Sequence, residues 1–200
     1  MNLKDFYYFN IQGYMTQFFA PPCTNLGKKG EWELLYGQYD SFDMPVIFQQ
    51  EKSYGGKKFT DFLNTGYGSI LSPISDKVLE ILIDNNITGW KSYPIIIYDK
   101  KGNLVEGYNG FSVTGRAGDF ISDTPFLKYK DIKDWYKEGG VGSYFDLSTW
   151  DGSDIFKLSN VGMIIVTEKV IKLFKEHKIT ACEYVKVSEY GIWKKEKIIR

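Results

Sequence analysis

Three acidic residues lie close together in the second half of the chain, in the run from Asp146 to Asp154. The run also contains Asp151, Trp150 and small polar residues, and this composition suits a loop that binds a cation, a sugar or a basic partner. Two of its carboxylates could serve a hydrolase as an acid–base pair, provided that a cleft shifts the pKa of one of them. The run differs from a calcium-binding loop, because Trp150 stands where an oxygen ligand is required. An ordinary turn at Asp151 and a helix cap at Asp154 are the structural alternatives.

Arg116 is a second candidate, because it is one of only two arginines in a chain with 25 basic residues. Its planar guanidinium can bind a carboxylate or phosphate at two points, which lysine cannot do. A local pair with Asp119 is the alternative role. Together the two features predict a partner-binding site formed by Arg116, Asp146, Trp150, Asp151 and Asp154.

Other catalytic and metal-binding sets are incomplete in the sequence. His177 is the only histidine, and it falls near the end of a predicted helix, where the helix dipole favours it. Cys23 and Cys182 lie far apart, so we expect buried, reduced thiols and neither a zinc site nor a disulfide. Gly55-Gly56-Lys57-Lys58 lacks key residues of a phosphate-binding loop, and Gly110 to Thr114 lacks the second glycine of a hydrolase nucleophile turn. We therefore expect no cofactor, no metal and no enzymatic activity.

The composition predicts a folded protein without a strong overall charge. Of 200 residues, 43% are hydrophobic and 17% are aromatic, which is enough to build a core. The 25 basic residues balance 25 acidic ones, so no net field attracts nucleic acid or an anionic membrane. The chain starts without a signal peptide pattern and has no run of about 20 apolar residues, so we expect a cytoplasmic location.

An internal repeat predicts the elements that must position the candidate residues. Residues 74–81 and 166–173 match in chemical type at every position except one, where Glu80 corresponds to Lys172. The same offset relates Ile87 to Ile179 further along. Two copies of one structural unit are therefore expected.

Each copy of the repeat predicts a strand, a helix and a second strand. Ser75 and Thr167 are favoured N-cap residues, and an acidic residue follows each of them at the positive end of the helix dipole. Apolar residues at helical spacing then predict one buried face for each helix. The four predicted strands are Ser69–Ile74, Trp90–Tyr98, Met163–Val166 and Cys182–Val187.

The rest of the chain predicts shorter elements. Asp99 to Asn103 is typical of a hairpin turn, and Leu104 to Thr114 would be the returning strand. A helical turn is expected from Lys130 to Lys137, and strands are expected at Trp32–Tyr36 and Pro45–Gln49. We predict an α+β fold with a duplicated strand-helix-strand unit and a largely antiparallel sheet. It would form one domain over residues 1–200 or two packed lobes, with repeat units at about 61–98 and 153–188.

Three stretches, Asn86–Trp90, Gly107–Arg116 and Phe145–Asp154, resemble bacterial proteins identified as predicted immunity proteins of polymorphic-toxin systems. The resemblance extends from near Asp61 to Glu189. It implies a cytosolic protein that binds and neutralises a cognate toxin domain, and it implies no catalytic residues. A domain that binds carbohydrate or peptide through Trp150, or a carboxylate-dependent hydrolase, is the alternative.

Overall fold

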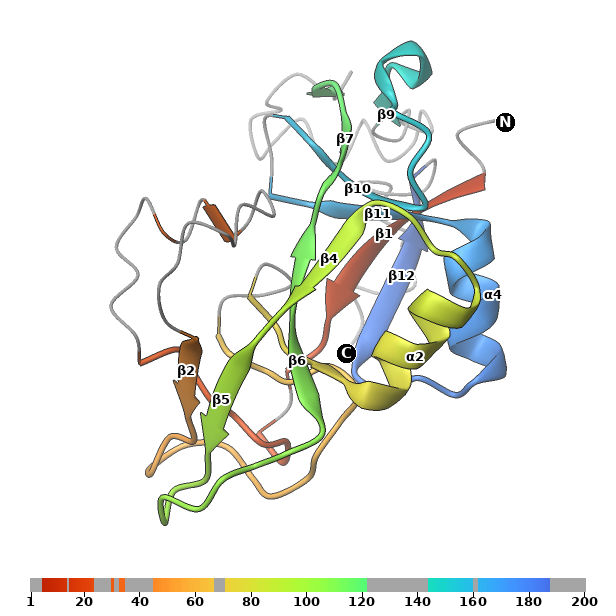
Figure 1. Cartoon of the computed structure of the whole chain (residues 1–200). Coiled ribbons are helices and arrows are strands. Elements are labelled where there is room, and N and C mark those ends of the chain that lie inside the picture. Colours follow the sequence, from red (N-terminus) through yellow and green to blue (C-terminus); the bar gives the residue numbers. More distant parts are fainter. Residues whose placement is uncertain are drawn as a thin grey trace, which may run out of the picture.

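In the part of the chain that the structure describes, two nine-residue helices and a set of mostly antiparallel strands build the α+β fold that the sequence predicts (Figure 1). The computed structural model describes residues 5–13, 15–23, 30, 33–34, 45–66, 71–121, 144–159 and 162–187. In these ranges, no helix combines the length and the apolar character that a membrane crossing requires.

The five-stranded sheet has the order β12–β1–β11–β10–β7. Its strands are β12 (Cys182–Lys186), β1 (Phe6–Ile11), β11 (Ile164–Thr167), β10 (Ile155–Leu158) and β7 (Gly115–Ala117). Neighbouring strands are antiparallel except β10 and β7, which are parallel. The N-terminal strand β1 therefore lies between the two strands of the second repeat unit.

Smaller groups of strands complete the fold. Antiparallel pairs join β6 (Tyr108–Val113) to both β3 (Ile74–Ser75) and β4 (Trp90–Tyr93), and join β8 (Phe120–Ile121) to β9 (Tyr144–Phe145). A parallel pair joins β2 (Val46–Gln49) to β5 (Ile95–Tyr98). Pro94 separates β4 from β5, because proline has no N–H to donate to a sheet. The single strand predicted from Trp90 to Tyr98 is therefore two strands with different partners.

Both helices begin where the sequence predicts. Helix α2 (Asp76–Asp84) follows Ser75, whose hydroxyl accepts a hydrogen bond from the backbone N–H of Val78. Helix α4 (Glu168–Glu176) follows Thr167, but the side chain of Thr167 makes no cap hydrogen bond. Its hydroxyl donates to the carboxylate of Asp154 instead, at 3.2 Å. The predicted hydroxyl cap is thus confirmed in α2 and wrong in α4.

The turns that end the two helices also correspond. Asn86 and Lys178 occupy equivalent positions of the repeat, and both have a positive φ, of 49° and 53°. Three residues later, Gly89 and Ala181 again share a positive φ, of 87° and 61°. Non-glycine residues rarely adopt this conformation, so its recurrence at matching positions supports the interpretation of the sequence repeat as two copies of one unit.

A strand from outside the repeat completes each unit. In the first unit β6 pairs with β3 and β4, and in the second unit β1 pairs with β11 and β12. The registers agree at both ends, because Tyr108↔Ser75 and Val113↔Trp90 correspond to Phe6↔Thr167 and Ile11↔Cys182. The second unit therefore takes its third strand from the opposite end of the chain, and the predicted unit boundaries at 61–98 and 153–188 exclude both completing strands.

The two units share one hydrophobic core. Val78 and Leu82 of α2 belong to the same buried cluster as Val170 and Phe174 of α4. A second cluster lies around β2 and β5, and includes Phe18, Leu34, Val46, Phe48, Leu63, Leu71, Tyr93 and Ile97. A third contains residues of β1, β10 and β11, including Phe6, Phe156 and Ile165. The first cluster makes each unit dependent on the other for burial of its apolar face.

Several sequence predictions differ from the structure. The strand predicted at Trp32–Tyr36 is wrong where it is described, because Glu33 and Leu34 are helical. The returning strand begins at Tyr108, and Leu104 makes only an isolated bridge to Tyr98. The predicted helical turn at 130–137 and the start of the strand predicted at 69–74 lie outside the described residues.

Asp61 connects the start of its own unit's helix to the end of the other unit's helix. Its carboxylate accepts a hydrogen bond from the hydroxyl of Ser75 at 3.0 Å. The backbone N–H and the hydroxyl of Thr180 both donate to its other oxygen, each at 2.8 Å. In return, the backbone N–H of Asp61 donates to the Thr180 hydroxyl at 3.0 Å.

Asp154 makes the reciprocal connection. Its carboxylate accepts from the hydroxyl of Thr167 in its own unit, and from the backbone N–H and hydroxyl of Thr88 in the other unit, at 3.1 and 3.3 Å. The backbone N–H of Asp154 donates to the Thr88 hydroxyl at 3.0 Å, and Lys169 forms a salt bridge of 3.5 Å with the carboxylate. The two aspartates thus join the units by matching sets of charge-assisted hydrogen bonds.

Removing either carboxylate is expected to destabilise the whole fold. In Asp61→Asn or Asp154→Asn, an amide NH₂ replaces one acceptor oxygen and the negative charge is lost. Hydrogen bonds to charged groups contribute roughly 1.5–3 kcal/mol, so we expect each variant to lower the free energy of unfolding by about 1–3 kcal/mol. Urea denaturation at neutral pH measures the loss.

Asp84→Asn is the matched control for this experiment. Asp84 is an exposed aspartate in the last turn of α2, where a negative charge opposes the helix dipole. Its replacement should leave stability unchanged or raise it slightly. If Asp154→Asn unfolded at the same urea concentration as the original chain, the carboxylate would not hold the two units together.

Candidate functional site

The structure brings Arg116 and Asp151 together through backbone contacts. The backbone N–H of Arg116 donates to the Asp151 carboxylate at 2.7 Å, and the N–H of Asp151 donates to the carbonyl of Arg116 at 3.0 Å. The guanidinium of Arg116 donates to the carbonyls of Val113 and Gly115, at 2.8 and 2.7 Å. These contacts join strand β7 to the acidic run, so both residues contribute to the fold at this point.

Asp146 and Trp150 flank the 3₁₀ helix η4 (Leu147–Thr149). The Asp146 carboxylate accepts from the hydroxyl and the N–H of Ser148, at 2.8 and 2.9 Å, and these bonds hold its pKa below the usual range. A general acid at neutral pH needs the opposite shift. Trp150 is half-buried, donates from Nε1 to the carbonyl of Ser153 at 3.0 Å, and packs edge-on against Phe6 at 5.0 Å.

The stretches Asn86–Trp90, Gly107–Arg116 and Phe145–Asp154 converge at one junction. Gly89 accepts hydrogen bonds at its carbonyl from Thr114 and Gly115, and Thr88 accepts at its carbonyl from Ile155. Asp154 contacts Thr88 here, as described above. Of the five predicted site residues, Arg116, Asp151 and Asp154 bond across this junction, whereas Asp146 and Trp150 bond within their own run. Their role in binding a partner stays a prediction.

The parts of the chain that the structure describes contain no candidate metal centre. Across those ranges, no group of three or more histidine, cysteine, aspartate or glutamate side chains is placed to hold a metal ion. His177 is the C-cap of α4, as the sequence predicts. Cys182 is partly buried, which raises the pKa of its thiol to about 11, but Cys23 is exposed, so its expected burial is wrong.

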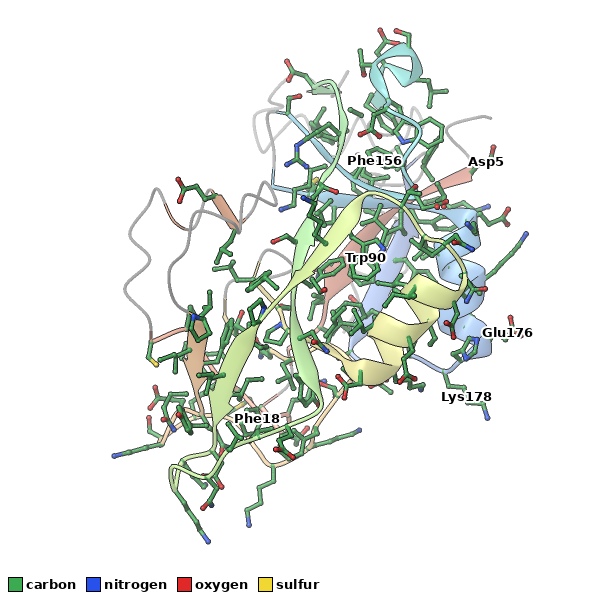
Figure 2. The ribbon with its side chains drawn as sticks, viewed as in Figure 1. Asp5, Phe18, Trp90, Phe156, Glu176 and Lys178 are labelled. Atoms are coloured by element: carbon green, nitrogen blue, oxygen red, sulfur yellow. The ribbon has the colours of Figure 1, made fainter. Side chains whose placement is uncertain are left out.

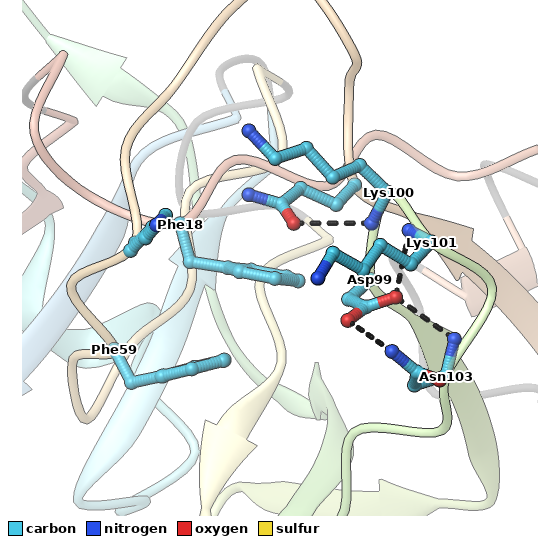
Figure 3. Close-up of a pocket in the computed structure, with 8 residues that line it drawn as sticks. Phe18, Phe59, Asp99, Lys100, Lys101 and Asn103 are labelled. Atoms are coloured by element: carbon cyan, nitrogen blue, oxygen red, sulfur yellow. Dashed lines mark hydrogen bonds between the residues drawn. The ribbon is translucent and has the colours of Figure 1, made fainter.

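The sequence does not predict a hollow near β2 and β5, at the opposite end of the molecule from the junction of Arg116, Asp151 and Asp154. In Figure 2 its residue Phe18 lies at the lower end of the view, and Phe156, which packs against Trp150, lies at the upper end. The hollow has a volume of about 260 Å³. Its lining, shown in Figure 3, is Phe18, Gln50, Lys57, Phe59, Asp99, Lys100, Lys101 and Asn103. We call it the lysine–phenylalanine hollow.

Two loops and one extended segment form the lysine–phenylalanine hollow. The rings of Phe18 and Phe59 stack with centroids 4.7 Å apart and planes 25° apart. Phe18 is buried, but half of Phe59 is exposed. Lys100 and Lys101 come from the turn after β5, which faces these rings in Figure 3.

The acidic residue in the lining of the hollow, Asp99, forms hydrogen bonds within its own turn. The Asp99 carboxylate accepts hydrogen bonds from the N–H groups of Lys101 and Asn103 and from the Asn103 side chain, each at 2.8 Å. These bonds, with the Asn103 side chain the largest cause, lower the pKa of Asp99. Within the described residues, no salt bridge involves Lys57, Lys100 or Lys101. The rim of the hollow is therefore cationic.

Exposed apolar side chains gather around the same end. Of the large hydrophobic residues that are exposed in the described ranges, Met15, Tyr54, Phe59 and Leu104 lie on the segments around the hollow. Residues 16–18 and 56–58 are joined by backbone hydrogen bonds, and Phe19 packs against Tyr54 at 4.9 Å. The sequence carries a signal for this surface, because both turns contain a Lys-Lys pair.

Lys157 is a buried cation beside Arg116 in the β10–β7 pair. It is only 5% exposed, and burial, with a smaller effect of the Arg116 charge, lowers its pKa to about 7. Lys157 is not among the candidates from the sequence, because it lies between apolar residues of β10. The structure shows that this strand is buried along its whole length.

No protein-family model and no curated protein matches this chain. Function is therefore inferred from the geometry of its surfaces.

Lys157 should make stability depend on pH. An unfolded lysine keeps its proton up to about pH 10, whereas folded Lys157 loses it near pH 7. Between these values the unfolded state binds more protons than the folded state. The contribution of Lys157 to the free energy of unfolding therefore rises with pH. The unfolding free energy of the original chain minus that of Lys157→Met should therefore increase from pH 6 to pH 9.

Denaturation of both proteins in urea at several pH values measures this difference. Lys186→Met, at an exposed lysine of β12, corrects for the loss of a lysine as such. A difference that stays constant for Lys157→Met would mean that Lys157 remains charged in the fold.

Proposed function

We propose that this protein binds and blocks a cognate toxin domain in the cytoplasm, as an immunity protein of a polymorphic-toxin system, without catalysis. The observation that carries the proposal is the grouping of exposed apolar residues and lysines at one end of the molecule. The resemblance of three stretches to predicted immunity proteins supports the choice of partner.

The two ends of the molecule differ in what their polar groups do. At the junction of Arg116, Asp151 and Asp154, the side chains bond to the backbone of neighbouring strands and turns. Around the lysine–phenylalanine hollow, side chains such as Met15 and Phe59 are exposed to 72% and 50%. Interfaces are rich in exposed aromatic and methionine side chains, so the second surface is the better candidate for partner binding.

Co-expression with a candidate toxin domain tests the proposed function. Cells that make both proteins should grow, and cells that make the toxin alone should die. If the cells died equally with and without this protein, it would not be the antidote.

Leu104→Asp is expected to weaken the toxin complex about tenfold or more, because a charge at an apolar anchor costs over 1.4 kcal/mol. Ile83→Asp is the matched control, since Ile83 on α2 is 57% exposed and Leu104 is 56% exposed. Titration calorimetry with the purified toxin domain measures both affinities. Equal affinities for the two variants would place the interface away from the hollow.

A further inference from the structure

We propose that the lysine–phenylalanine hollow is the anchor site for one segment of the partner protein, in which an acidic side chain stands next to an aromatic side chain. The inference rests on the proposed function and deepens it, because it names the chemistry of the partner's contact segment. Size, charge, shape and rigidity of the hollow each support it.

The size of the hollow suits a side chain better than a whole small molecule. Pockets for drug-sized ligands and cofactors measure about 300–1,000 Å³, whereas this hollow measures about 260 Å³. One or two side chains fill such a space. Protein interfaces concentrate their affinity in small pockets of this kind, each filled by an anchor residue of the partner.

The charge of the hollow selects an acidic group. Lys57, Lys100 and Lys101 contribute three positive charges to the lining. The single carboxylate, that of Asp99, directs its oxygens at N–H groups of its own turn. A carboxylate that enters the hollow therefore meets the ammonium groups of these lysines, in surroundings where partial exclusion of water strengthens the attraction.

The aromatic pair selects a ring. Phe18 forms the buried base of the stack, and Phe59 leaves half of its surface open to a partner. Leaving an exposed phenyl ring in water is unfavourable, and a second ring can cover it in a stacked or edge-on arrangement. An aromatic side chain next to the acid fits this arrangement.

Gln50 holds the hollow in shape before a partner arrives. Its side chain is 4% exposed, donates from Nε2 to the carbonyl of Gly56 at 3.0 Å, and accepts at Oε1 from the N–H of Lys100 at 3.1 Å. These bonds tie the loop that carries Lys57 to the turn that carries Lys100. A preformed site binds more tightly, because less conformational entropy is lost on association.

Titration of the full-length protein with the blocked tripeptide acetyl-Asp-Trp-Asp-amide tests the proposal, with backbone NMR shifts as the readout. We expect saturable shifts at the amides of Phe18, Gln50, Phe59 and Asn103. The neutral analogue acetyl-Asn-Trp-Asn-amide should bind several times more weakly. The double variant Lys100→Glu/Lys101→Glu should lose about tenfold in affinity, since each exposed ion pair contributes up to about fivefold.

Lys77→Glu is the matched control, because it reverses the charge of an exposed lysine on α2, away from the hollow. It should bind the acidic tripeptide as the original chain does. Equal binding of the acidic and neutral peptides would overturn the proposal, as would unchanged affinity in the double variant. Inorganic phosphate alone giving the same shifts at the same concentration would also overturn it, by indicating a bare anion site.

The toxin complex separates this proposal from the proposed function. If the double variant neutralised the toxin with unchanged affinity, the hollow would not be the anchor, although the protein would remain an antidote. If the original chain failed to neutralise the toxin but bound the acidic tripeptide in the hollow, the proposed function would fail and the chemistry of the hollow would stand.

Discussion

The fold depends on two aspartates that each belong to one unit and bind the other. Each unit has one nine-residue helix and short strands, which bury too little apolar surface to be stable alone. The shared core supplies the driving force, but apolar contacts have no direction of their own. The bonds from Asp61 to Thr180 and from Asp154 to Thr88 supply that direction, because a carboxylate accepts donors only in a narrow geometry.

The same constraint explains why polar side chains form structural hydrogen bonds at one end of the molecule and are exposed at the other. The acidic run and Arg116 look like a binding surface in the sequence, yet their polar atoms serve the junction between units, strands and turns. Among the described residues around β2 and β5, the lysine side chains at the rim of the hollow form no salt bridge. Its lysines and half-exposed Phe59 therefore remain available to a partner.

Local elements could be predicted well, because their signals are local. The N-cap positions Ser75 and Thr167, the C-cap His177 and the turn after Tyr98 all lie within a few residues of the elements they define. The prediction failed where a distant residue competes. The Thr167 hydroxyl donates to Asp154 instead of capping its helix.

By itself, the sequence determined the α+β class, the start of both helices and the paired strand-helix-strand pattern, since spacing and cap chemistry are properties of a short stretch of chain. Only the tertiary structure decided that β1 completes the second unit and that Asp61 contacts Thr180, which are 119 residues apart. It also decided which lysines meet Phe18 and Phe59 in one hollow. Such contacts depend on how the shared core orients the units, and no local pattern encodes that orientation.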